Sequence, residues 1–131
     1  MRVLNIGSLN LDHVYNVDHI VQPGETEATG ELNIHLGGKG MNQSVALAKA
    51  GVETYHGGLI GDDGQPFLDA CKEFGVHADY IRTIDTKSGH AIIQINQHGE
   101  NAIIVFGGSN QAVTQEQIEQ VMAQFDAGDF L

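Results

Sequence analysis

The sequence is poor in basic residues, cysteine, proline and tryptophan. Its 131 residues contain 6 Lys and Arg against 17 Asp and Glu, a formal net charge of −11, with one cysteine, two prolines and no tryptophan. A nucleic-acid or anionic membrane surface needs clustered basic side chains, so neither is expected as a partner. One cysteine excludes an intramolecular disulfide framework and a paired-cysteine metal site. No run approaches the roughly 20 apolar residues that cross a bilayer, and no signal-peptide pattern is present. We therefore expect a cytoplasmic protein.

What is present is typical of a globular domain with many turns. Apolar residues make up 41% of the chain, and 17 residues are glycine. Apolar spacing at i, i+3, i+4 and i+7 predicts helices over 67–74 and 118–125. Pro66 and Gly75 bound the first of these, and Thr114 and Gln117 stand three apart, as a capping box requires. Small residues over 42–50 predict a third helix that ends at Gly51.

The strands are shorter. Residues 3–7 and 54–60 are predicted to be buried strands, each followed by a turn rich in Gly and Asp. Residues 92–96 and 102–106 flank a four-residue turn and predict a hairpin, and 13–17 with 32–36 predict another strand pair. Strands that alternate with helices indicate an α/β fold with a largely parallel sheet. The two hairpins do not fit that alternation and predict an accessory sheet.

The last residues, Phe130 and Leu131, follow a helix and a polar turn over 126–129. An apolar strand that stops after two residues is unusual for a complete domain. We therefore expect this chain to be the front part of a longer protein. The alternative is a frayed terminal tail.

The sharpest local feature is the glycine-rich stretch Gly37-Gly38-Lys39-Gly40-Met41-Asn42-Gln43 at the predicted start of a helix. Glycine allows positive φ, so backbone N–H groups can turn toward one point, where the helix N-terminus adds partial positive charge. The stretch is neither a Walker loop nor a dinucleotide-binding GxGxxG motif. It is a candidate site for an oxygen-rich ligand, although a purely structural turn has the same pattern.

Asn10 and Asp12 form the second candidate feature, directly after the first strand. Residues two apart in an extended chain project to the same side, and ligands of open α/β sheets bind beyond the carboxyl ends of the strands. An amide beside a carboxylate suits the vicinal hydroxyls of a polyol, because the amide donates and accepts while the carboxylate accepts. An Asx turn that ends the strand is the alternative.

Together these features resemble the ribokinase (PfkB) family of carbohydrate kinases. The family's Gly-Ser-x-Asn-x-Asp segment matches residues 7–12, and its Gly-Gly-x-Gly-x-Asn-Gln loop matches residues 37–43. Residues 61–64 resemble the family's Gly-Asp-Asp turn, and residues 100–110 resemble its second lid strand with the turn after it. The resemblance spans nearly the whole chain.

The resemblance implies a fold, a site and a reaction. It implies a ribokinase-like α/β domain with a small β-sheet lid, formed by strands within about residues 12–36 and 90–106, and residues 1–131 as its sugar-binding N-terminal portion. The sugar-binding residues would be Asn10, Asp12, Gly37, Gly38, Lys39 and Asn42. The reaction would be ATP-dependent phosphorylation of a primary hydroxyl of ribose or a related sugar or nucleoside, and lid strands of two subunits would pair in a homodimer.

No catalytic residue is expected in this chain. The family's catalytic base and its sites for ATP, Mg²⁺ and a monovalent cation belong to the later part of the chain, which the front portion would lack. This chain alone is therefore expected to be inactive. The alternative hypothesis is a non-catalytic sugar-binding or dimerisation module of 131 residues.

The remaining polar residues have simpler interpretations. Seven histidines form no HxH or HxxxH pair, so no metal site is expected. Cys71 lies on the apolar side of its helix and is expected to be a buried, unreactive thiol. Asp62 and Asp63 are interpreted as a cap of the helix that follows.

Overall fold

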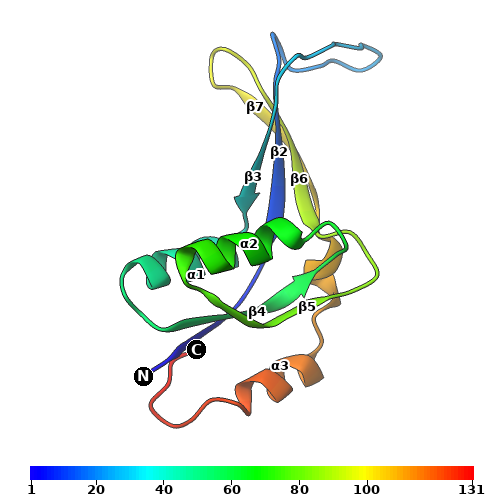
Figure 1. Ribbon diagram of the computed structural model, residues 1–131. Helices are drawn as coiled ribbons and strands as arrows, with labels where there is room; N and C mark the ends of the chain where they lie inside the picture. Colours follow the sequence, from blue (N-terminus) through cyan, green and yellow to red (C-terminus); the bar gives the residue numbers. More distant parts are fainter.

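Two β-sheets organise the chain, and the computed structural model describes all residues 1–131 (Figure 1). The core sheet is parallel, has the order β1-β4-β5, and consists of Val3–Ile6 (β1), Thr54–Ile60 (β4) and His77–Thr83 (β5). The second sheet, here called the lid sheet, has the order β3-β2-β6-β7. Its strands are Asn10–Asn16 (β2), Leu32–Gly37 (β3), Gly89–Ile95 (β6) and Asn101–Phe106 (β7).

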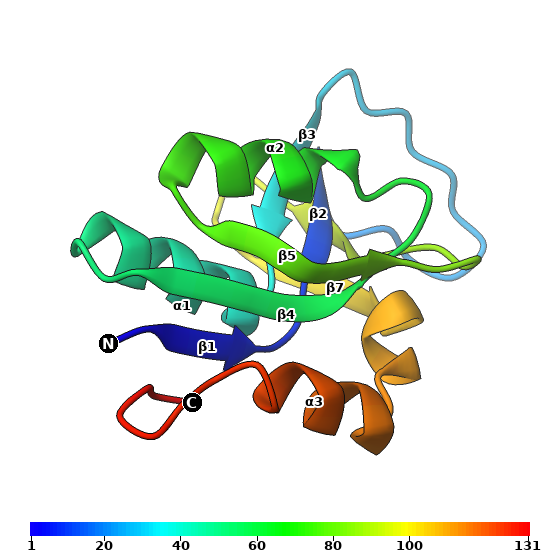
Figure 2. The same ribbon diagram turned by 60° about the horizontal axis from the view of Figure 1, so that its bottom comes forward.

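Helices cover both faces of the core sheet, as Figure 2 shows. Helices α1 (Lys39–Lys49) and α2 (Gln65–Phe74) lie on one face, and α3 (Gln115–Met122) lies on the other. A short 3-10 helix, η1 (Gly108–Ala112), joins the end of the lid sheet to α3. The predicted α/β class with a parallel main sheet and an accessory sheet is confirmed. None of these helices is both long enough and apolar enough to traverse a lipid bilayer.

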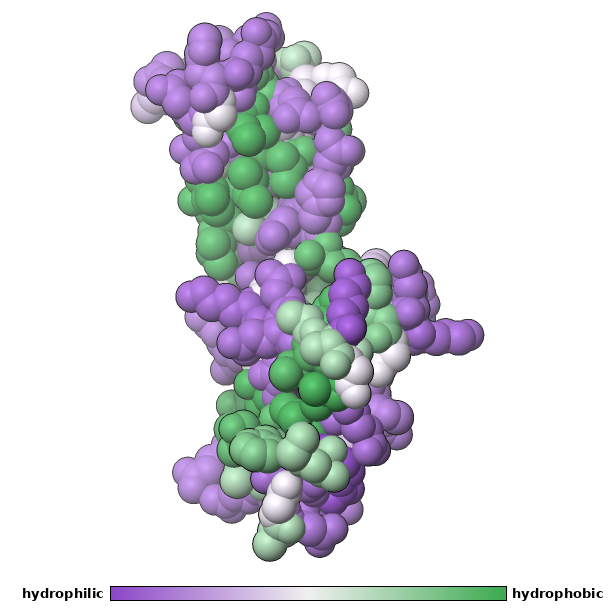
Figure 3. Space-filling model, turned by 90° about the vertical axis from the view of Figure 1, so that its left-hand side faces the viewer, coloured by the Kyte–Doolittle hydropathy of each residue, from purple (hydrophilic) through white to green (hydrophobic).

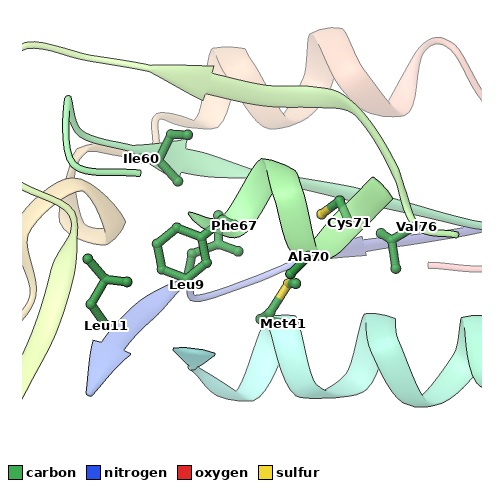
Figure 4. Close-up of a cluster of buried hydrophobic side chains, with 8 residues drawn as sticks. All are labelled: Leu9, Leu11, Met41, Ile60, Phe67, Ala70, Cys71 and Val76. Carbon is green, nitrogen blue, oxygen red and sulfur yellow. The ribbon is translucent and has the colours of Figure 1, made fainter. Parts of the chain in front are cut away.

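The hydrophobic core lies between the core sheet and the two helices α1 and α2 (Figure 4). Phe67 of α2 is completely buried at its centre, and Leu11 brings the base of the lid sheet into the same cluster. Burying a side chain the size of Phe67 contributes about 1.5–3 kcal/mol. The lid sheet is thus anchored to the core by its base, while its far end stands clear of the helices (Figure 1). The buried members are Leu9, Leu11, Met41, Ile60, Phe67, Ala70, Cys71 and Val76.

Sequence signals that act within one helical turn correctly predicted the end of α2 and the start of α3. Helix α2 has Pro in its first turn and ends at Gly75, whose φ of 74° lies in the left-handed region. Helix α3 begins with the predicted capping box, in which the Thr114 side chain accepts from the Gln117 backbone N–H at 3.2 Å. The Gln117 side chain accepts from the Thr114 N–H at 3.0 Å in return.

Four expectations need correction. Strand β5 was not predicted, because it is a polar edge strand that only its pairing with β4 defines. Helix α1 begins at Lys39 rather than residue 42, and α3 ends at Met122 rather than residue 125. Asp62 and Asp63 do not cap α2, whose N-cap is Gly64 without a side-chain cap. The Asp63 carboxylate instead accepts from the Ser88 N–H at 2.9 Å, and Asp62 pairs with Lys87.

The lid sheet confirms the accessory sheet and joins its two predicted strand pairs into one layer. Strands β2 and β3 pair antiparallel, as do β6 and β7, and β2 pairs with β6 in parallel. Strands β2 and β6 begin three residues before the predicted ranges, at Asn10 and Gly89, and each ends one residue early. Strand β3 ends one residue later than predicted, and β7 begins one residue earlier.

The last residues lie along the free edge of β1. The Leu4 N–H donates to the Phe130 carbonyl, and the Phe130 N–H donates to the Arg2 carbonyl, which forms one parallel bridge beside Val3. The turn before it is held by Asp129, whose carboxylate accepts from the Arg2 guanidinium and from the Arg2 backbone N–H. These contacts hold the pKa of Asp129 well below its usual range. The residues that were expected to begin a strand thus form a single parallel bridge next to β1.

Candidate functional site

The two motifs singled out in the sequence meet at the base of the lid sheet. Asn10, the first residue of β2, is the register partner of Gly37, the last residue of β3. Asn10 lies four residues after the end of β1, and Gly37 lies two residues before the start of α1. The antiparallel pairing of β2 with β3 therefore brings together two segments that are far apart in the sequence.

Asp12 lies against the backbone of Gly37. A Cβ atom at Gly37 would collide with the Asp12 carboxylate, so only glycine lets the carboxylate occupy this place. The Asp12 side chain is partly buried and has no salt-bridge partner. The carboxylate is thus held at the lid base with acceptor capacity to spare.

Asn10 is held by Asn110 of η1. The Asn110 Nδ2 donates to Asn10 Oδ1 at 2.8 Å and to the Leu9 carbonyl at 3.1 Å, while its Oδ1 accepts from the Leu9 N–H at 3.0 Å. Because Asn10 Oδ1 accepts from Asn110, its Nδ2 group is the part of the amide that can donate to a ligand. The sequence showed Asn110 only as part of the turn after the last lid strand; its contact with Asn10 depends on tertiary structure.

The glycine loop crosses the end of β1 at very short range. Gly38 has a φ of 93°, and its Cα faces the Ser8 carbonyl so closely that a side chain would collide with it. Two residues later, Gly40 packs directly on Gly7, and the Met41 N–H donates to the Ser8 carbonyl at 3.1 Å. The N-terminus of α1 is therefore fixed against the segment that carries Asn10 and Asp12.

Lys39 and Asn42 are the two predicted residues that stand apart from this group. Both are exposed in the first turn of α1, and neither forms a hydrogen bond from its side chain to Asn10 or Asp12. Asn42 lines a hollow of about 290 Å³ between α1 and α2. The structure thus gathers Asn10, Asp12, Gly37 and Gly38, and leaves Lys39 and Asn42 beside them on the helix.

The lid sheet adds an apolar wall to the same face. Directly paired residues of neighbouring strands share one face of a sheet. The face of Asn10 and Asp12 therefore also carries aliphatic side chains farther along the strands, among them Ala91, Ile93, Ile103 and Val105. Beside Asn110, a hollow of about 220 Å³ is lined by Ile6, Gly7, Ser8, Asn110 and Val113.

This face combines hydrogen-bonding groups at its base with aliphatic groups above them. Such an arrangement suits a ligand that has hydroxyl groups on its edge and C–H groups on its faces, as a sugar has. No group of three or more His, Cys, Asp and Glu side chains is arranged to hold a metal ion. Cys71 is buried as expected, and burial raises the pKa of its thiol to about 11.

The model of the pfkB family of carbohydrate kinases matches residues 2–131. The chain belongs to that family. Among its relatives, the ribokinase of Haemophilus influenzae is 34% identical over 129 residues, which cover 96% of this chain and 42% of the relative. The pfkB chain described here thus spans less than half the length of that protein.

Solved structures agree with this relationship. A ribokinase of Cryptococcus neoformans in complex with ADP is 39% identical, with a TM-score of 0.77 over 82% of this chain and 35% of that protein. An Arabidopsis thaliana ribokinase complexed with ribose and ATP is 32% identical, with a TM-score of 0.81 over 92% of this chain and 42% of that protein. The expected ribokinase-like fold is therefore confirmed for the N-terminal portion of the family's structures.

Proposed function

We propose that this chain is the sugar-binding portion of an ATP-dependent kinase that phosphorylates a primary hydroxyl of ribose or a related sugar or nucleoside. One observation carries the proposal: the Asn10–Asp12 pair and the Gly37–Gly38 loop lie together on one face at the lid base. The similarity to a ribokinase complexed with ribose and ATP supports the same substrate class.

The polar groups of this face are complementary to vicinal hydroxyls. With its oxygen engaged by Asn110, Asn10 would donate from Nδ2 to one hydroxyl oxygen. Asp12 would accept a hydrogen bond from the neighbouring hydroxyl, and its negative charge would strengthen that bond. The backbone of Gly37 and Gly38, with Lys39 and Asn42 on the first turn of α1, would bound the other side of the sugar ring.

The residues of this chain do not fit the phosphate-transfer half of the reaction. The glycine loop lacks the Ser or Thr of a phosphate-binding Walker loop, and no acidic cluster suits a divalent cation. We therefore place ATP, Mg²⁺ and a monovalent cation outside the residues of this chain, and we assign it no catalytic base. By itself the chain would bind sugar without phosphorylating it.

The proposal is tested by extending the chain along its reading frame. ADP release is measured with ATP and a panel of ribose, 2-deoxyribose, fructose, tagatose and nucleosides. We expect the extended protein to turn over one of these sugars or nucleosides. Residues 1–131 alone should release no ADP. If the extended protein turns over none of them, the kinase proposal is wrong. If the frame closes at Leu131, the alternative module hypothesis gains support.

We further propose that the opposite face of the lid sheet pairs with a second copy of the chain. That face carries large apolar side chains that are about half exposed, among them Ile34 at 55%, Ile104 at 69% and Phe106 at 49%. Figure 3 shows apolar side chains gathered along the lid, framed by polar ones. An exposed apolar sheet face with free edge strands is a feature that proteins normally cover.

A further inference from the structure

A hydrogen-bonded network of side chains lies beneath the candidate site and takes no part in the ligand contacts proposed above. His56 of β4 and Ser44 of α1 are both fully buried, with exposed fractions of 0%. His56 Nδ1 lies 2.7 Å from Ser44 Oγ, and His56 Nε2 lies 3.2 Å from the Gly7 carbonyl oxygen. The imidazole therefore links α1 to the end of β1.

The partners fix where the protons are. A carbonyl oxygen only accepts, so Nε2 carries the hydrogen and donates to Gly7. In a neutral ring Nδ1 then accepts from the Ser44 hydroxyl, whose oxygen in turn accepts from Asn5 Nδ2 at 2.9 Å. Burial lowers the pKa of His56 to about 4, which keeps the ring neutral near pH 7, as this pattern requires.

The two outer residues of this network, Asn5 and His56, each bind a backbone carbonyl where β1 crosses α1 under the site. Asn5 uses its second Nδ2 hydrogen to donate to the Gly40 carbonyl at 2.8 Å, and His56 holds the Gly7 carbonyl. Gly7 and Gly40 are the residues whose backbones touch where β1 passes α1, and a Cβ on either would collide with the other. The residues that follow them, Ser8 and Met41, are joined by the backbone hydrogen bond described above.

We infer that Asn5, Ser44 and His56 are positioning residues that set the spacing between the Asn10–Asp12 segment and the glycine loop. They are joined by hydrogen bonds, Ser44 and His56 are fully buried and Asn5 is half-buried, and the outer two residues donate to the carbonyls of Gly40 and Gly7 at the crossing. The inference rests on the proposed function only in taking the two segments to bind one ligand. The effect on the backbone itself can be measured without any ligand.

Hydrogen–deuterium exchange tests the backbone effect in the extended protein that is used to test the proposed function. The variants are Ser44→Ala and His56→Phe. Alanine at position 44 is compatible with a helix, and phenylalanine at position 56 places an apolar ring in a buried position. Each variant is therefore expected to fold. Amides of the peptide over 37–43 should exchange about tenfold faster in either variant, while the peptide over 65–74 in α2 keeps its rate. Thr54→Val is the matched control, since Thr54 is equally buried on the same strand, and its hydroxyl donates to the Val52 carbonyl instead.

Kinetics test the consequence for the ligand. The KM for ribose should rise about fivefold in both variants, while the KM for ATP and the exchange of α2 stay unchanged. His56→Gln, which retains a donor for the Gly7 carbonyl, should recover part of both effects. The double variant Ser44→Ala/His56→Phe should change the exchange by less than the two single effects combined, because the residues act as one unit.

Different outcomes overturn different claims. Unchanged exchange over 37–43 in both single variants overturns the positioning inference, even if the enzyme phosphorylates ribose normally. Equal effects of His56→Gln and His56→Phe would show that the donor to the Gly7 carbonyl has no role, and would also overturn the inference. A wild-type protein that phosphorylates no sugar overturns the proposed function, but the exchange measurement still decides whether the three residues fix the crossing.

Discussion

Asn110 Nδ2 donates to Asn10 Oδ1 at 2.8 Å, across a sequence separation of 100 residues. This contact fixes which end of the Asn10 amide faces the candidate sugar site. It also ties the start of β2 to η1, so the lid base is fastened to the segment that follows the last lid strand. The donor pattern of the site is therefore set by a residue outside both sequence motifs.

Replacing Asn110 should weaken sugar binding. Asn110→Ala frees the Asn10 amide to rotate and removes the hydrogen bonds to Leu9, at a cost of about 1–1.5 kcal/mol. If ribose is the substrate as proposed, its KM should rise about five- to tenfold in steady-state assays of the extended protein. Asn110→Asp is the informative control, because it keeps the acceptor for the Leu9 N–H but can no longer donate to Asn10. An Asn110→Asp enzyme with the wild-type KM would show that the amide orientation is irrelevant.

Removing the Asp12 carboxylate should have a larger effect. Asp12→Ala loses a hydrogen bond to a charged acceptor, worth about 1.5–3 kcal/mol, so the KM for ribose should rise by about one to two orders of magnitude and kcat should fall. Gly37→Ala should act through the same group, because its new Cβ would displace the carboxylate. The combined variant should therefore be little worse than Asp12→Ala.

The companion measurement uses Lys39→Ala, which should change the KM much less if the glycine loop acts through its backbone. Isothermal titration with ribose or the best substrate gives the affinities directly. Wild-type affinity in Asp12→Ala would mean that the pocket has been misplaced.

Substitutions on the two faces of the lid sheet should distinguish dimer formation from sugar binding. Ile104→Lys places a charge on the face proposed for the second copy, and sedimentation velocity should show a shift from dimer to monomer. Ile103 neighbours it on the same strand but lies on the face of Asn10 and Asp12. Ile103→Lys should leave the dimer intact and raise the KM for the sugar. A monomeric wild-type protein would contradict the proposed pairing.

His56 should make the protein less stable as the pH falls. Its pKa is lowered by burial to about 4 from an ordinary value of 6.5, so between these values the unfolded state binds more protons than the folded state. The stabilising contribution is complete above about pH 6.5 and is lost as the pH falls toward 4, by up to about 3 kcal/mol.

Urea denaturation between pH 4 and pH 7 measures this effect. Subtracting the unfolding free energy of His56→Phe at each pH removes the contribution of the carboxylates, which also lose stability on acidification. A pH slope in this window that is the same in the wild type and in His56→Phe would show that His56 does not titrate in the folded state as described.

Local signals in the sequence determined much of the fold. Pro66 and Gly75 bound α2, and the Thr114 capping box starts α3, because each acts within one turn of its own helix. The hairpin of β6 and β7 could be recognised for the same reason, since a short turn joins its two apolar runs. The Asn10–Asp12 pair and the glycine loop could be named from their residue types and spacing alone.

Only the tertiary structure decided how these pieces meet. Strand β5 exists because β4 supplies its hydrogen-bonding partner, and Asp63 binds the Ser88 N–H instead of capping the helix beside it. The contacts Asn110–Asn10 and His56–Ser44 likewise join residues whose separation in the chain hides their proximity. Hydrogen-bond strength depends on distance and direction in space, so a sequence can name the groups that bind, but the packing of sheets and helices chooses their partners.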